Sequence, residues 1–146
     1  MSEVSFTVHG RPQQRGSKRP ITSKKTGKTI MLDMNKNSRP WMNAVADAAA
    51  VAMNGQPLLD GPLRLSVTFE FKRPASHYGK RKGQPYLKEQ APKFVTTTPD
   101  ADKLIRSIGD AMTGVVYHDD KQISLFYADK VYTNCSEGAI ITVAML

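Results

Sequence analysis

Five charged side chains in one short stretch have the types and spacing that metal-assisted phosphoryl chemistry requires. Asp100 and Asp102 stand two residues apart, Arg106 follows Asp102 by four, and Asp119 and Asp120 are adjacent further on. Residues two apart in an extended segment point to the same side. Mg²⁺ prefers one or two carboxylates completed by waters and phosphate oxygens. The spacing therefore indicates a divalent-metal site, with Arg106 placed to pair with Asp102 or to meet a phosphate.

A purely structural interpretation explains each of these residues singly. Asp100 fits a helix N-cap, and Asp119 with Asp120 fits a polar turn. However, a protein for a polyanion gains nothing electrostatically from clustered carboxylates unless a metal ion lies between them and the phosphate. Spacing and charge alone leave both interpretations open.

The chain around this stretch is strongly basic. Its 146 residues carry 21 Lys and Arg against 13 Asp and Glu, a net charge of +8. The net charge is +7 over residues 1–40, +4 over 41–99 and −3 over 100–146. Such an excess indicates a polyanionic partner, and the lack of a basic amphipathic helix favours nucleic acid over a membrane.

Two basic segments, at about 11–28 and 72–93, are expected to be loops that contact DNA. The first is expected to be a mobile loop or an open hairpin that returns through a short strand at 29–32. The second carries Tyr78 and Tyr86, whose rings can stack on bases. Solvated surface loops are the alternative for both segments. The predicted DNA-binding residues are Arg11, Arg15, Lys18, Arg19, Lys24, Lys25, Lys80, Arg81, Lys82 and Lys103.

Apolar periodicity gives the elements that must position these residues. Alternation predicts strands at 4–8, 63–71, 123–127 and 139–145. Ser38 as cap and Pro40 in the first turn predict a helix from residue 38 to about 53, ended by Asn54-Gly55. An apolar stripe of helical period predicts a second helix from Pro99 or Asp100 to Gly114. We expect a single domain over residues 1–146.

The cysteine content and the N-terminus bear on the compartment. Cys135 is the single cysteine, so a disulfide framework within one chain is excluded. The N-terminus does not resemble a signal peptide, and no run approaches the ~20 apolar residues of a membrane span. We expect a cytoplasmic protein.

Three motifs together resemble the RusA family of Holliday-junction resolvases. They are D-A-D-K-L-I-R at 100–106, D-A-M at 110–112 and H-D-D-K-Q-I at 118–123. The family pattern reads roughly D-x-D-N-L-x-K, D-A-L and D-D-x-Q-[IV]. V-H-G-R-P-Q at 8–13 is similar to the family's opening strand and loop, and the insertion at 72–93 is similar to phage-type members.

The resemblance implies a small α/β (α+β) fold, with a mixed sheet and two main helices. It also implies a homodimer that nicks two strands of a four-way DNA junction with Mg²⁺, or alternatively Mn²⁺, in recombination, repair or phage DNA processing. Encoding by a phage or prophage is one origin that the resemblance allows. The alternatives are a non-catalytic junction or single-stranded DNA binding protein, and a nuclease that prefers forks or flaps.

The resemblance also assigns site residues. Asp100, Asp102 and Asp120 match the metal-binding aspartates, and Asp119 matches their neighbour, the alternative further metal ligand. Arg106, the fourth residue expected to be catalytic, stands where the family usually has a lysine near the active centre. Two departures are Lys103, at the usual Asn position, and Arg106 itself. Arginine can clamp a phosphate, but it stays protonated and so cannot transfer a proton.

Overall fold

The computed structural model describes residues 2–146, and its secondary structure is mixed α and β. The strands are β1 (Glu3–His9), β2 (Lys18–Thr22), β3 (Thr29–Asp33), β4 (Leu63–Lys72), β5 (Tyr78–Arg81), β6 (Gln84–Leu87), β7 (Ile123–Thr133) and β8 (Gly138–Met145). The α-helices are α1 (Ser38–Met53) and α2 (Ala101–Met112), and short 3₁₀ helices lie at Ala75–His77 and Asp120–Gln122. The predicted α+β class with two main helices is confirmed.

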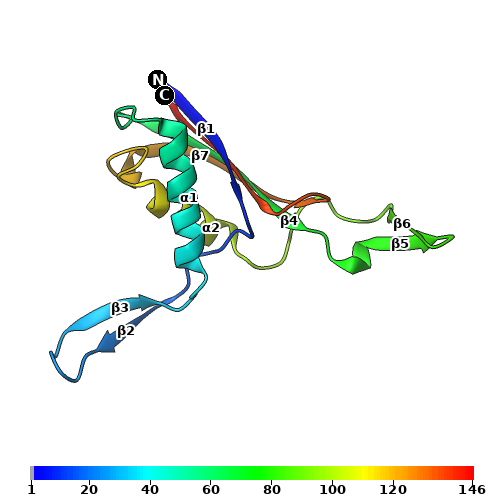
Figure 1. Cartoon of the computed structure of the whole chain (residues 1–146), viewed down its shortest axis with the longest axis horizontal. Helices are drawn as coiled ribbons and strands as arrows, with labels where there is room; N and C mark the ends of the chain where they lie inside the picture. The colour runs from blue at the N-terminus through cyan, green and yellow to red at the C-terminus, as the bar shows by residue number, and fades with distance from the viewer. Residues whose placement is uncertain (1) are drawn as a thin grey trace.

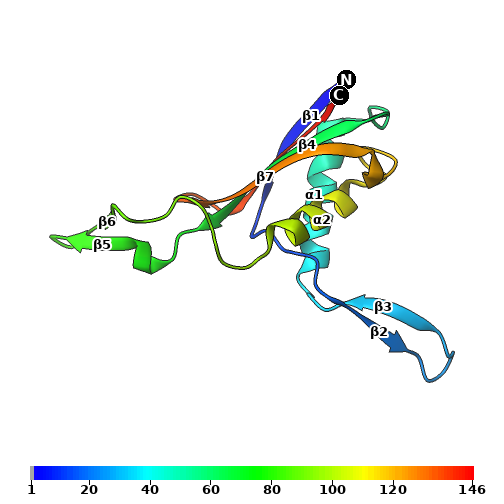
Figure 2. The same ribbon diagram turned by 180° about the vertical axis from the view of Figure 1, so that it is seen from behind.

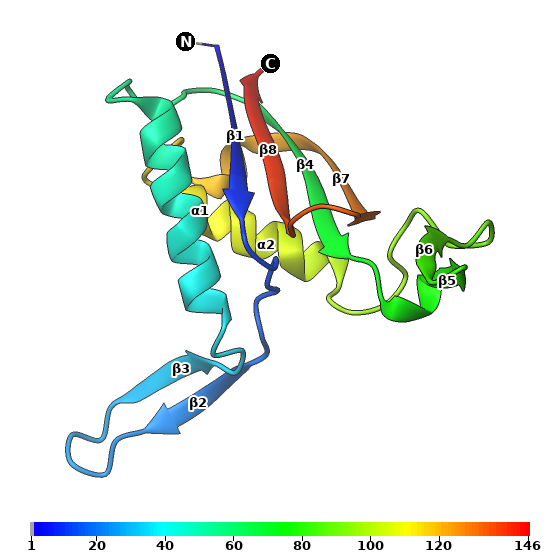
Figure 3. The same cartoon turned by 45° about the vertical axis from the view of Figure 1, so that its right-hand side comes forward.

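Four strands form the main sheet in the order β1-β8-β4-β7. β8 pairs antiparallel with β1 and with β4, whereas β4 and β7 are parallel. A parallel pair cannot be joined by a tight turn and needs a crossover. The crossover here contains the β5–β6 hairpin and helix α2, so the topology places the start of α2 beside the edge strand β7 (Figure 3).

The core lies between one face of this sheet and the two helices. The alternation seen in the sequence buries every second side chain of β4, from Leu63 to Phe71. Helix α1 contributes Trp41 and Val45, and α2 contributes Leu104 and Ile108, to the same cluster. The opposite face of the sheet is open and carries polar residues, among them Ser66, Thr68 and Thr142.

Helix α1 has the predicted length but a different cap. Its N-cap is Asn37, so the expectation that Ser38 caps the helix is wrong. Ser38 is instead buried, and its hydroxyl donates to the carboxylate of Asp33. The helix ends where expected, because Asn54 adopts a left-handed conformation with φ of 48°.

Both basic segments form antiparallel hairpins that project from the body (Figures 1 and 2). The β2–β3 hairpin realises the open-hairpin alternative for the first segment. The second segment was expected to be a loop, and the β5–β6 hairpin corrects this. Lys82 and Gly83 both have positive φ, at 50° and 76°, as a tight two-residue turn requires.

Within residues 2–146, neither α1 nor α2 is long and apolar enough to cross a membrane.

Candidate functional site

Asp100 is the N-cap of helix α2, and a distant segment fixes its backbone. The Asp100 N–H donates to the Oε1 atom of Gln14 at 2.7 Å. The Arg15 N–H donates to the carbonyl of Lys103 at 3.3 Å. The segment after β1 therefore lies along the first turn of α2, and it leaves the carboxylates of Asp100 and Asp102 exposed to solvent.

Asp102 and Arg106 are one helical turn apart on α2, and both are exposed. Within residues 2–146, neither belongs to an ion pair, so the expected Asp102–Arg106 pairing is not formed in this structure. Lys103 is the cation that meets the acidic end of the helix, with its Nζ 3.5 Å from Oδ2 of Asp100. Asp102 and Ile105 line a shallow hollow against Phe126 of β7.

Asp119 has a structural role in the turn that precedes β7. Its Oδ1 accepts from the Lys121 N–H at 2.9 Å, while Oε1 of Gln122 accepts from the Asp119 N–H at 3.1 Å. This reciprocal capping box starts the 3₁₀ helix. The backbone hydrogen bond, with the nearby charge of Lys121, holds the pKa of the Asp119 carboxyl below its ordinary value.

Asp120 faces helix α2 at Gly109 and Asp110. A Cβ atom placed on Gly109 would lie 3.9 Å from the Cβ of Asp120, an ordinary van der Waals contact, so Asp120 packs close to this turn of α2. Partial burial, and then the charge of Asp110, raises the pKa of Asp120 above its ordinary value. Burial and the same two carboxylates also raise the pKa of Tyr117, whose hydroxyl donates to the Gly109 carbonyl at 2.7 Å.

The structure thus places two clusters of aspartates at different positions along helix α2. Asp100 and Asp102 lie in its first turn, and Asp120 meets Asp110 near its end. Among residues 2–146, no three His, Cys, Asp or Glu side chains are close enough together to hold a metal ion. Arg106 lies between the two levels along the helix. The exposed carboxylates have donor chemistry that suits a hard divalent cation, but the chain alone does not close a three-aspartate cage.

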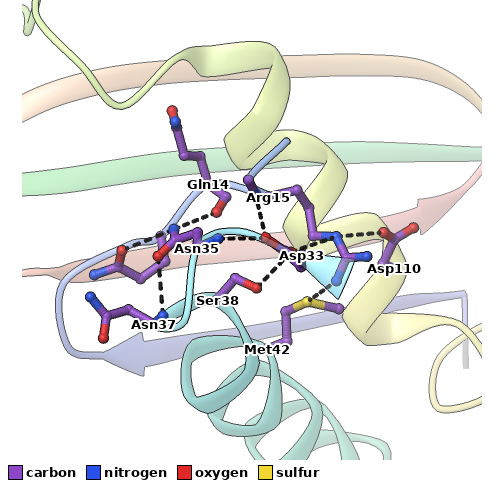
Figure 4. A network of polar contacts seen from close by, with 10 residues as sticks. Gln14, Arg15, Asp33, Asn35, Asn37, Ser38, Met42 and Asp110 are labelled. Atoms are coloured by element: carbon purple, nitrogen blue, oxygen red, sulfur yellow. Dashed lines mark hydrogen bonds and ion pairs between the residues drawn. The ribbon is translucent and has the colours of Figure 1, made fainter. Parts of the chain in front are cut away.

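A polar network connects the base of the β2–β3 hairpin to both helices (Figure 4). Oδ1 of Asp33 accepts from the backbone N–H groups of Gly16 and Asn35, at 2.9 and 2.8 Å. The Arg15 Nε lies 3.4 Å from Oδ2 of Asp33 and 3.5 Å from Oδ2 of Asp110. Sequence reasoning assigned no role to Asp33, Asp110 or Gln14. Asp110 lies within one of the family motifs, which was the one available signal.

The predicted DNA-binding residues fall into two groups. Arg11 pairs with Glu137 at 2.8 Å, Arg15 belongs to the internal network, and Lys103 pairs with Asp100. The other seven are exposed on the two hairpins, and in the described chain none of them forms an ion pair: Lys18, Arg19, Lys24, Lys25, Lys80, Arg81 and Lys82. The Arg81 guanidinium lies over the Tyr86 ring at 4.6 Å.

Two comparisons with known proteins bear on this site. A sequence model of the family described as "Endodeoxyribonuclease RusA" matches residues 10–144. The chain is also 29% identical over 136 residues to the uncharacterized protein YqaN of Bacillus subtilis (strain 168). The aligned region covers 91% of this chain and 90% of that protein. The family match includes α2, the Asp119-Asp120 turn and both hairpins.

Proposed function

Because the chain belongs to the RusA family of endodeoxyribonucleases, we propose that it is a divalent-metal-dependent nuclease that resolves four-way DNA junctions by paired nicks. The observation that carries this proposal is the exposed Asp100-x-Asp102 start of α2, with Asp120 against the same helix. These carboxylates lie in a chain whose exposed hairpin cations suit DNA phosphates.

The metal would be Mg²⁺, with Mn²⁺ as the alternative, held by Asp100, Asp102 and Asp120. When bound, such an ion stabilises charge on phosphate oxygens and lowers the pKa of a bound water. Mg²⁺ usually takes only one or two protein carboxylates and completes its shell with waters and substrate phosphates. The spread of the aspartates over two levels of α2 is compatible with a site that the DNA completes.

The chain's own residues have separate tasks in this proposal. Gln14 holds the backbone of Asp100, and so fixes where the first carboxylate is presented. Arg106 is exposed beside Asp102 and offers its guanidinium to the phosphate, where charge develops as the bond breaks. It stays protonated throughout, so it contributes charge and orientation and takes no proton.

Paired nicks call for two copies of this site on one junction. Each chain supplies one acidic helix start, and a two-fold dimer is the commonest way for a protein to present two equivalent sites. We therefore propose a homodimer matched to the symmetry of the four-way junction.

Asp102→Asn provides the test. Junction cutting should fall by about 1000-fold or more, while junction affinity in EDTA stays near that of the unchanged protein. Asp47→Asn is the matched control, because Asp47 is exposed on α1 and forms no ion pair among the described residues. Cleavage is measured on a labelled four-way junction, a fork and a plain duplex, with Mg²⁺ and with EDTA. Junction cutting by Asp102→Asn at the wild-type rate would overturn the assignment of this site. If the wild-type protein cuts forks faster than junctions, forks are the substrate instead.

A further inference from the structure

The β2–β3 hairpin exposes large apolar side chains that the rest of the described chain, residues 2–146, does not cover. Ile30 and Met31 are 60% and 59% exposed, and Ile21 and Leu32 are 43% and 44% exposed. The hairpin projects away from the sheet and the helices (Figures 1 and 2). An isolated two-stranded ribbon has no core of its own, so these side chains are available to a partner.

The strand register distributes the apolar residues over both faces of the ribbon. Ile21 lies opposite Ile30, and Pro20 lies opposite Met31 one position along. Successive positions in a strand point to opposite faces. A ribbon that lies on a membrane or on a flat protein surface needs only one apolar face. Two apolar faces suit a thin element that is covered on both sides.

The charge of the hairpin identifies the partner. Lys18 and Arg19 lie at its base and Lys24, Lys25 and Lys28 lie around its turn, with no acidic residue from 17 to 32. A second copy of this hairpin would bring the same charge and be repelled. DNA combines phosphates for the cations with flat apolar bases that can cover both faces of the ribbon. Ile, Leu, Met and Pro are the side chains that DNA-binding proteins insert between base steps.

The base of the hairpin is joined to helix α2 by polar contacts. Met34 donates its N–H to the Ser17 carbonyl at 2.9 Å, and Asp33 joins Arg15 and Asp110 through the network described above. An element inserted into DNA from this base would therefore keep a defined relation to Asp100 and Asp102.

We propose that the β2–β3 hairpin is a wedge that inserts Pro20, Ile30 and Met31 against unstacked bases at a DNA branch point, while its lysines hold the flanking phosphates. This inference rests on the proposed function, since it takes branched DNA as the substrate. Unstacking costs less where bases are already unpaired or distorted. The wedge would therefore favour branched DNA over plain duplex.

The test is a junction that carries 2-aminopurine at the branch point, titrated with protein in EDTA so that no cutting occurs. The fluorescence of this base rises when it is unstacked, and the saturated wild-type complex should raise it several-fold. Ile30→Thr with Met31→Thr keeps strand-forming residues and removes the apolar side chains. We expect this variant to lose the rise and to bind the junction about tenfold more weakly, with duplex binding unchanged.

Lys24→Ala with Lys25→Ala is the matched control on the same hairpin. It should weaken junction and duplex binding alike and keep the fluorescence rise at saturation, since it removes phosphate contacts only. No rise in the wild-type complex, or a full rise with the threonine variant, would overturn the wedge. The wedge would also be overturned, in favour of a membrane, if the wild type and the lysine variant bind anionic phospholipid vesicles and the threonine variant does not. The readout needs no cleavage, so a protein that opens the branch point but never cuts DNA would contradict the proposed function alone.

Discussion

Asp33 is the residue at which the β2–β3 hairpin and the two helices converge. It accepts hydrogen bonds from Asn35, Ser38 and Gly16, and it lies beside the Arg15 guanidinium. Partial burial would raise the pKa of this carboxyl, but the hydrogen bonds and the charge of Arg15 outweigh burial and lower it. The charged form of Asp33 is therefore part of what holds the hairpin in place.

Asp33→Asn should lower the free energy of unfolding by about 1–3 kcal/mol at pH 7. Because the folded pKa lies below the unfolded one, the carboxylate stabilises the fold above the unfolded pKa, and this stability is lost as pH falls through the folded pKa. The difference between wild type and variant should thus shrink as the pH drops below about 4. Urea unfolding from pH 7 down to pH 2.5 measures it, with Asp47→Asn as the exposed control. A difference that stays constant with pH would contradict the role of the charge.

The position of Arg15 in the fold could not be predicted from its place in the sequence. As one cation among many in the first basic segment, it was expected to contact DNA, and that role remains a prediction. The structure leaves its side chain only 16% exposed, between Asp33 and Asp110. These partners are 18 and 95 residues away in the chain, so only the folded backbone brings them together. We infer that Arg15 positions the hairpin and contributes little charge to the DNA surface.

Two glycines at the contacts between elements should respond to alanine in opposite ways. A Cβ on Gly16 would collide with the Asn35 backbone and with Oδ1 of Asp33 at 2.5 Å. A Cβ on Gly109, inside α2, would meet only ordinary contacts at 3.9 Å. Gly16→Ala should destabilise the protein by about 1–3 kcal/mol, whereas Gly109→Ala should stabilise it by up to about 1 kcal/mol through helix propensity. Thermal unfolding of both variants checks the signs, and a Gly16→Ala variant as stable as the wild type would show that the Asp33 turn is not tightly packed.

At the scale of elements, the sequence predicts helices and strands that show a regular apolar period. It misses hairpins and caps that depend on the conformation of a single residue. The alternation in β4 and the apolar stripe of α2 placed both elements within a residue or two, because burial on one face imposes a period. The β5–β6 hairpin escaped prediction, because its turn depends on Lys82 taking a positive φ, which is uncommon for lysine. The predicted cap of α1 lies one residue late, because serine and asparagine are both common caps and the sequence does not show that Ser38 bonds to Asp33 instead.

Across the whole molecule, charge separates by distance from the main sheet. Among the ten predicted DNA contacts, the seven that form no ion pair within residues 2–146 lie on the two hairpins, while Arg11, Arg15 and Lys103 are paired to carboxylates within the body. The candidate aspartates lie at the start of α2 and in the turn before β7, within that body, and the two hairpins project from it in different directions (Figure 1). The total charge and its drop after residue 100 were visible in the sequence, but the sorting of paired and unpaired cations required the fold.

This sorting predicts unequal contributions to DNA affinity. Each cation that neutralises a phosphate contributes about 0.9 to the slope of log affinity against log salt concentration. Lys80→Ala with Lys82→Asn should reduce that slope by about 2, and asparagine tolerates the positive φ of residue 82. Arg11→Ala should reduce it by less than 1, because Glu137 already pairs with the guanidinium at 2.8 Å. Junction binding in EDTA over a range of KCl concentrations measures both.

A combined variant tests whether the two hairpins hold separate DNA arms. If they do, the losses in binding free energy from Lys80→Ala with Lys82→Asn and from Lys24→Ala with Lys25→Ala should add when all four substitutions are combined. A combined loss no larger than that of either pair alone would show that both hairpins contact one arm.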